Sequence, residues 1–221
     1  VSTAPGAPTI DSITPGNGQL SVSFTAPSSN GGAAITDYKC SINGGTYFSL
    51  ATTTSPFVLS TLTNGTAYSI TIKAVNSAGD GTASNSGSGT PRTVPSASII
   101  TGITPGNGNL SVAFTSGSDG GAAVTNYKYS LNGGSSFTAF SPAQTTSPVS
   151  ISGLTNGTAY TFTVTASNGL FTSSPSTASS SVVPATVPTT PTSVTATSTT
   201  SGSATVTFTA PSTGGSAITG Y

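Results

Sequence analysis

The chain has no His, Met, Trp or Glu, a single Cys, and only four acidic and four basic residues among 221. Without these side chains the usual general bases, activated nucleophiles and zinc ligands are missing, so we expect no enzyme and no catalytic, metal or cofactor site. Four scattered Asp residues cannot supply the clustered oxygens of a typical calcium site. A formal net charge of zero leaves no basic patch for phosphate, which excludes nucleic acid as a partner. No apolar run approaches the roughly 18 residues that cross a bilayer, so we expect no membrane span.

Thr, Ser, Gly, Val and Asn replace the missing charge. Thr and Val favour strands because a branched Cβ fits a pleated surface, whereas Gly, Asn and Pro favour turns. With 27 Gly and 15 Pro, the composition is typical of an all-β protein with many short strands. The chain opens at Val1 without a visible signal peptide, so we interpret it as a piece of a longer protein.

The sequence repeats itself with a period near 90 residues. The phrase Ile-Thr-Pro-Gly-Asn-Gly at Ile13 returns at Ile103, and a third copy starts near Pro188. Proline lacks an amide donor and restricts the residue before it, so the prolines around 91–95 and 184–188 predict short, extended joints. We therefore expect a rod-like chain of three domains: two complete repeats, 1–92 and 93–186, and a partial one, 187–221.

Within each repeat, apolar residues alternate with polar ones. Leu20, Val22 and Phe24 alternate with serines, and a longer alternating run begins at Tyr68 and returns at Tyr160. A period of two predicts antiparallel strands that bury one face, and about seven such strands per repeat predict a β-sandwich. The Asn-Gly pairs at 43–44 and 132–133 accept positive φ at little cost and predict tight hairpin turns.

Two phrases resemble the fibronectin type III family. Leu62-x-x-x-Thr66-x-Tyr68, which returns with Tyr160, is similar to the tyrosine-corner stretch, and residues 31–38 are similar to the B–C loop and strand C of such repeats in bacterial surface and secreted proteins. The resemblance implies tandem seven-stranded antiparallel β-sandwiches, two complete and one partial. It also implies that the Tyr68 and Tyr160 hydroxyls bond back to the backbone. Phe24 departs from the Trp that this family commonly carries there, which gives up some buried area.

Four further residues are candidate sites. Cys40 has the inward parity of its strand, which indicates a small buried hydrophobe; an intermolecular disulfide is the alternative. Asn64, Asn109 and Asn156 satisfy the N-glycosylation sequon. At Asn64 and Asn156 the demands of a turn alone would also explain an Asn-Gly pair.

The remaining polar and aromatic residues are expected to be structural. Asp37, Lys39, Asp80, Asp119 and Lys128 lie in predicted loops or on outward faces, where they keep the surface solvated. The only aromatic residues that could stack on sugar are expected to pack in the core or at strand edges instead: Tyr47, Phe48, Phe137, Phe140 and Phe171.

These features favour a non-catalytic structural module of an extracellular fibre, surface stalk or filament, acting as a spacer. The alternative is a glycan- or protein-binding accessory module of a secreted multidomain protein, with adhesion to a glycan or surface receptor. We expect neighbouring repeats as partners, and other copies of the chain in a filament. In the partial repeat Val194, Val206 and Phe208 lack a second sheet, and a lone strand pair is marginal in water. Either the chain continues, or another subunit supplies the missing strands.

Overall fold

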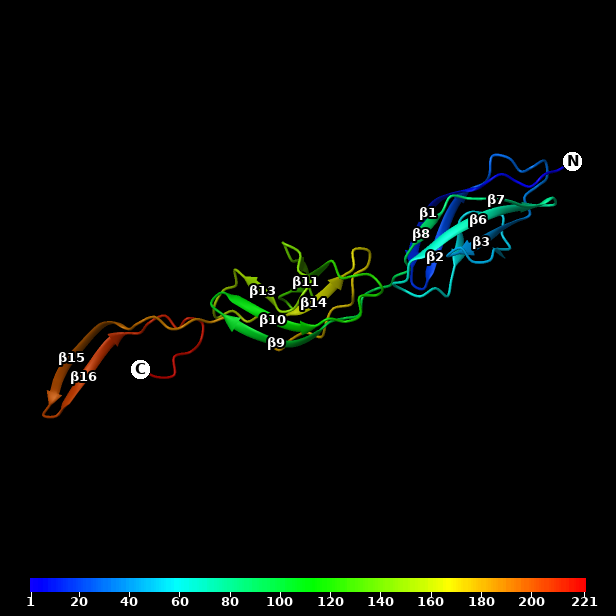
Figure 1. Cartoon of the computed structure of the whole chain (residues 1–221). Helices are drawn as coiled ribbons and strands as arrows, with labels where there is room; N and C mark the ends of the chain where they lie inside the picture. The colour runs from blue at the N-terminus through cyan, green and yellow to red at the C-terminus, as the bar shows by residue number, and fades with distance from the viewer. The chain divides into compact units, whose positions relative to one another are not determined.

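The computed structural model describes residues 1–221 and contains β-strands but no helix, which confirms the all-β prediction. The chain divides into two compact units, residues 1–95 with 118–123, and residues 96–117 with 124–221. A β-sandwich lies in each unit, and the second unit also holds a separate hairpin (Figure 1).

The first sandwich has eight strands in two sheets. One sheet has the order β1-β2-β5, and the other has the order β4-β3-β6-β7, with β8 also paired to β6. All pairings are antiparallel, and β7 and β8 together form one interrupted edge of β6. The bounds are β1 (Thr9–Gly16), β2 (Gln19–Thr25), β3 (Asp37–Ile42), β4 (Phe48–Ser49), β5 (Phe57–Leu59), β6 (Tyr68–Asn76), β7 (Gly79–Ala83) and β8 (Gly87–Gly89).

The core of the first sandwich comes from the alternating positions. Leu20 and Val22 from β2 meet Ile70 and Ile72 from β6, and all four side chains are fully buried. Phe24, where the related family commonly has Trp, is buried against Tyr38 with the ring centroids 4.5 Å apart. The predicted alternation therefore identifies the buried side chains that each of the two sheets contributes to this core.

The second sandwich repeats this plan with fewer regular strands. Its sheets have the orders β13-β10-β9 and β12-β11-β14. The position of the last strand, which β7 and β8 hold in the first sandwich, is occupied by residues 172–182, which make only isolated bridges. The bounds are β9 (Ile99–Gly106), β10 (Asn109–Thr115), β11 (Asn126–Ser130), β12 (Thr138–Ala139), β13 (Val149–Ser152) and β14 (Thr163–Ser167).

One of the two predicted hairpin turns is displaced. Asn43 and Gly44 have φ of 52° and 71°, as expected for the first turn. In the second sandwich the positive φ values fall on Gly133 and Gly134 instead of Asn132 and Gly133. Asn132 keeps negative φ. Its side-chain amide bonds Ser130 and Ser136, and these bonds fix Asn132 as the residue before the turn.

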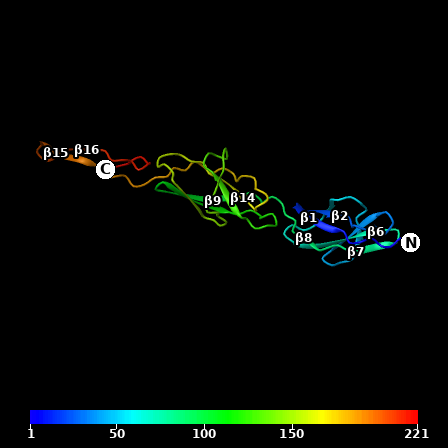
Figure 2. The same ribbon diagram turned by 90° about the horizontal axis from the view of Figure 1, so that it is seen from above.

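The remaining strands, β15 (Thr192–Thr200) and β16 (Ser203–Thr209), pair only with each other. Figure 2 shows this hairpin from above, with no second sheet against either face. Val194, Val206 and Phe208 are exposed, with relative accessibilities of 61%, 56% and 38%.

Candidate functional site

The two corner tyrosines occupy matching places in the two sandwiches. The Tyr68 hydroxyl accepts a hydrogen bond from the backbone N–H of Thr63 at 3.0 Å, and the Tyr160 hydroxyl accepts one from Thr155 at 3.1 Å. Both bonds lie at the surface, where water competes for the same groups. Each bond ties the chain at or just before a strand, β6 or β14, to the turn that precedes it.

The sequon asparagines lie in the same corners. The Asn64 carboxamide accepts from the N–H of Gly18 at 2.9 Å and donates to the Asn17 side chain at 2.8 Å. Asn156 makes the same pair of bonds, to Gly108 at 2.8 Å and to Asn107 at 2.7 Å. The structure thus places Asn64 and Asn156 as clamps between two turns, and their glycosylation stays a prediction.

Asn109 differs from the other two sequon residues. It begins β10, and its amide donates to the Asn107 carbonyl at 3.1 Å within the turn that precedes the strand. The turn itself uses Gly108 at φ 65°. Glycosylation of Asn109 also stays a prediction.

Cys40 lies in the middle of the first core. The prediction of a buried small hydrophobe is confirmed, because its side chain is fully buried among the inward residues of β3 and β6. Burial raises the pKa of the thiol to about 12, since a thiolate would lose its hydration there. The thiol is therefore neutral and shielded at physiological pH.

Two lysines of the first sandwich contact side chains near them. Lys39 and Asp80 form an ion pair at 2.8 Å, with both side chains about one third exposed, which is a weak surface interaction. The Lys73 ammonium lies 4.5 Å from the centre of the Tyr47 ring, and the Tyr47 hydroxyl bonds Thr71 at 2.8 Å. These contacts anchor Tyr47 to the face of its own sheet.

The other aromatic candidates do not gather into one platform. Phe140 is buried in the second core, where its ring lies 4.7 Å from that of Tyr129. Phe48 in β4 is the most exposed of them, at 43%. The predicted packing at core and strand edge describes Phe140 and Tyr47.

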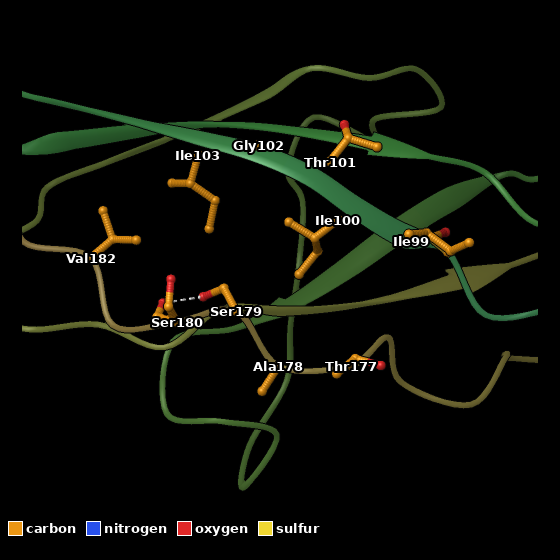
Figure 3. A pocket seen from close by; sticks show the side chains of 11 residues that line it. Ile99, Ile100, Thr101, Gly102, Ile103, Thr177, Ala178, Ser179, Ser180 and Val182 are labelled. Atoms are coloured by element: carbon orange, nitrogen blue, oxygen red, sulfur yellow. Dashed lines mark hydrogen bonds between the residues drawn. The ribbon is translucent and has the colours of Figure 1, made fainter.

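A cleft that sequence reasoning did not find opens on the second sandwich. It has a volume of about 370 Å³ and lies between β9 and residues 177–182. Figure 3 shows Ile100 and Ile103 extending from β9 toward Val182 and Ser179. Ser98 also lines the cleft; it is only 2% exposed and its hydroxyl has no hydrogen-bond partner.

Three serines at a spacing of three, of which Ser179 lines the cleft, hold the segment that leads to its wall. Each serine donates its backbone N–H to the carbonyl of a residue in the neighbouring segment 162–166. The serine hydroxyl accepts the backbone N–H of that same partner residue, at 2.9–3.1 Å. The pairs are Ser173 with Ala166, Ser176 with Val164, and Ser179 with Phe162. This serine ladder replaces the regular edge strand, and its signal in the sequence is the recurrence of Ser every third residue.

Comparison with known proteins finds a family model that matches the first sandwich. Residues 3–90 match the family model described as Fibronectin type III domain. A crystal structure of chicken CNTN1 FN1-FN3 domains is 16% identical, covers 83% of this chain and 69% of that chain, and has a TM-score of 0.46. A search of curated proteins found no match. No helix in the structure is long and apolar enough to cross a membrane.

Proposed function

Because residues 3–90 match the Fibronectin type III domain model and a second sandwich repeats their plan, we propose that the chain is a structural spacer in an extracellular fibre, surface stalk or filament. Domains of this family are generally non-catalytic modules of extracellular or cell-surface multidomain proteins. The proposed domains are 1–92, 93–186 and a partial 187–221. In this role each domain adds length, and the chain itself performs no chemistry.

The observation that carries the proposal is the repetition of the corner clamps. Tyr68 and Asn64 make the same three bonds to neighbouring turns as Tyr160 and Asn156 make in the second sandwich. The groups repeated between the two domains therefore hold turns in place. The exposed aromatic residues are not repeated in the same way. Phe48 is exposed, whereas Phe137, which also follows the hairpin turn in the second repeat, is half-buried.

Single-molecule stretching tests the spacer role. Each complete domain of about 90 residues should unfold in its own event and release roughly 30 nm of chain. Two events of that size, each shifted separately by a mutation in its own domain, are expected. One event for the whole chain, or extension without any resolved event, would refute an array of independent load-bearing domains.

A second property, self-assembly, is favoured by the exposed hairpin. The residues at the positions of the buried Val22 and Phe24 are Val206 and Phe208; here both are exposed, and the Phe208 ring lies 4.6 Å from that of Tyr221. Strands from further along the chain or from another copy would cover this face. Sedimentation velocity over a range of concentrations tests the second case: association is expected to weaken in Val206→Asp, and a monomer at every concentration would exclude assembly in trans.

A further inference from the structure

Asn-Gly pairs are unusually frequent in this chain. In such a pair the backbone nitrogen of the glycine can attack the Asn side chain, because glycine has no Cβ to hinder its own nitrogen. Two nitrogens take part in this reaction: the glycine nitrogen attacks, and the Asn Nδ2 leaves. A hydrogen bond donated by either nitrogen opposes the reaction, because that bond must break first. The eight pairs begin at Asn17, Asn30, Asn43, Asn64, Asn107, Asn132, Asn156 and Asn168.

In seven of these pairs the glycine N–H already donates a hydrogen bond. The weakest of these bonds are those of Gly31 and Gly169, each to a serine hydroxyl two residues earlier, at 3.2 Å and 3.4 Å. The other five have donor–acceptor distances of 2.8–3.0 Å. These five donors are Gly18, Gly65, Gly108, Gly133 and Gly157. The fold therefore protects most of its Asn-Gly pairs by engaging the attacking nitrogen.

Asn43-Gly44 is the exception among the eight pairs. The Gly44 N–H donates no hydrogen bond in the structure, and neither does the Asn43 Nδ2. Both residues are exposed in the turn after β3, and a Cβ on Gly44 would meet no atom within 4 Å. The Asn43 carboxamide is bonded only through its oxygen, which accepts the Ser69 N–H at 2.8 Å. That bond withdraws electron density from the carbon that the glycine nitrogen attacks.

The matching pair in the second sandwich, Asn132-Gly133, is protected at both nitrogens. Gly133 donates its N–H to the Thr161 carbonyl at 3.0 Å. The Asn132 Nδ2 donates to the Ser136 hydroxyl, also at 3.0 Å. The same dipeptide at the same place in the repeat therefore has its attacking and its leaving nitrogen engaged, and it provides a control within the same chain.

We propose that Asn43 is a site of self-modification, at which the native protein deamidates. The Gly44 nitrogen gives its proton to a base in the solvent and attacks Cγ of Asn43. The new C–N bond closes a succinimide ring, and the bond between Cγ and Nδ2 breaks to release ammonia. Water then adds to one of the two ring carbonyls and opens the ring to aspartate or isoaspartate. The overall change consumes water and releases ammonia, and it goes beyond the spacer role without depending on it.

Both products change the first sandwich at one turn. Aspartate adds a negative charge to a chain that has only four acidic residues. Isoaspartate carries the chain through the former side chain, so the backbone of the turn gains one atom. The bond from the Gly45 N–H to the Ile42 carbonyl, 3.0 Å long, then loses the geometry that closes this turn.

The test incubates the full native chain at mildly alkaline pH and follows every Asn-Gly pair by tandem mass spectrometry of protease fragments. Deamidation is detected as the mass difference between OH and NH₂. Asn43 should convert first, roughly fivefold or more faster than Asn132, which is the factor that one ordinary hydrogen bond supplies. The rate should rise with pH, because the attacking nitrogen must lose its proton. No conversion of Asn43, or conversion of Asn132 at an equal rate, would overturn the proposal.

The same incubation in urea separates the effect of the fold from that of the local sequence. In the unfolded chain every glycine N–H is free, so Asn43 and Asn132 should convert at similar rates. A preference for Asn43 that persists unchanged in urea would assign the selectivity to neighbouring residues and refute the structural argument. Asn43→Asp is the matched variant, and the native variant should lose the fastest conversion while the other pairs keep their rates. An equally fast conversion elsewhere in that variant would also refute the assignment.

Discussion

The corner bond of Tyr68 gives the sharpest test of how the structure holds its turns. Tyr68→Phe removes the hydroxyl that accepts from Thr63 at 3.0 Å and leaves the ring in place. If the partner N–H were buried, the loss would cost roughly 1–3 kcal/mol. In the structure Thr63 is at the surface, where water can replace the hydroxyl, so we expect about 1 kcal/mol, the net value of an ordinary hydrogen bond.

Thermal unfolding of the full chain measures this effect. For a domain of this size, about 1 kcal/mol lowers the midpoint by roughly 4–8 °C. The two sandwiches have separate cores, so Tyr68→Phe should shift only the transition of the first and Tyr160→Phe only that of the second. Tyr129→Phe is the control, because its ring packs on Phe140 while its hydroxyl makes no hydrogen bond in the structure. Unchanged midpoints in both corner variants, or an equal shift in the control, would refute the reasoning.

Four further predictions concern single residues. Because burial raises the Cys40 pKa to about 12, the unfolded thiol, with its pKa near 9.0, ionises first, so stability should fall as pH rises from about 9 toward 12. A Cys40→Ala variant should lose the part of this fall that begins near pH 9, below the range in which the raised pKa of Tyr38 acts. Alkylation of Cys40 in native protein should be slow, and rapid labelling would contradict its burial. Gly31→Ala should cost more than about 2 kcal/mol in urea unfolding, because its Cβ would collide with the Thr3 carbonyl; Gly44→Ala has the same φ of 71° but open space and should cost only about 1 kcal/mol. Asn85→Ala should destabilise the first sandwich by about 1–2 kcal/mol through its two bonds to Ile10, and an unchanged urea midpoint would show that the bridge is dispensable.

The sequence predicts the core well and the cleft poorly, for a physical reason. Alternation at Leu20, Val22 and Phe24 reports which face is buried, since burial follows the pleat of a strand. The cleft depends on how the irregular segment 177–182 lies beside β9, and the pattern of residue types along the chain does not report that placement.

The displaced turn has the same kind of origin. The pair Asn132-Gly133 looks equivalent to Asn43-Gly44, but the serines around Asn132 bond its amide and move the turn by one residue. Propensity describes what a dipeptide allows, and the neighbouring side chains decide which of the allowed conformations is adopted.

The serine ladder has a mechanical consequence. Between Ser173 and Ser179 it uses three residues for every two of the chain from Phe162 to Ala166, so this edge carries more chain than a regular strand of the same span. The surplus over that span is two residues, roughly 7 Å of extended backbone. Under tension the ladder can release this slack bond by bond while the core beneath it stays folded, which gives the domain a short compliant range before it yields.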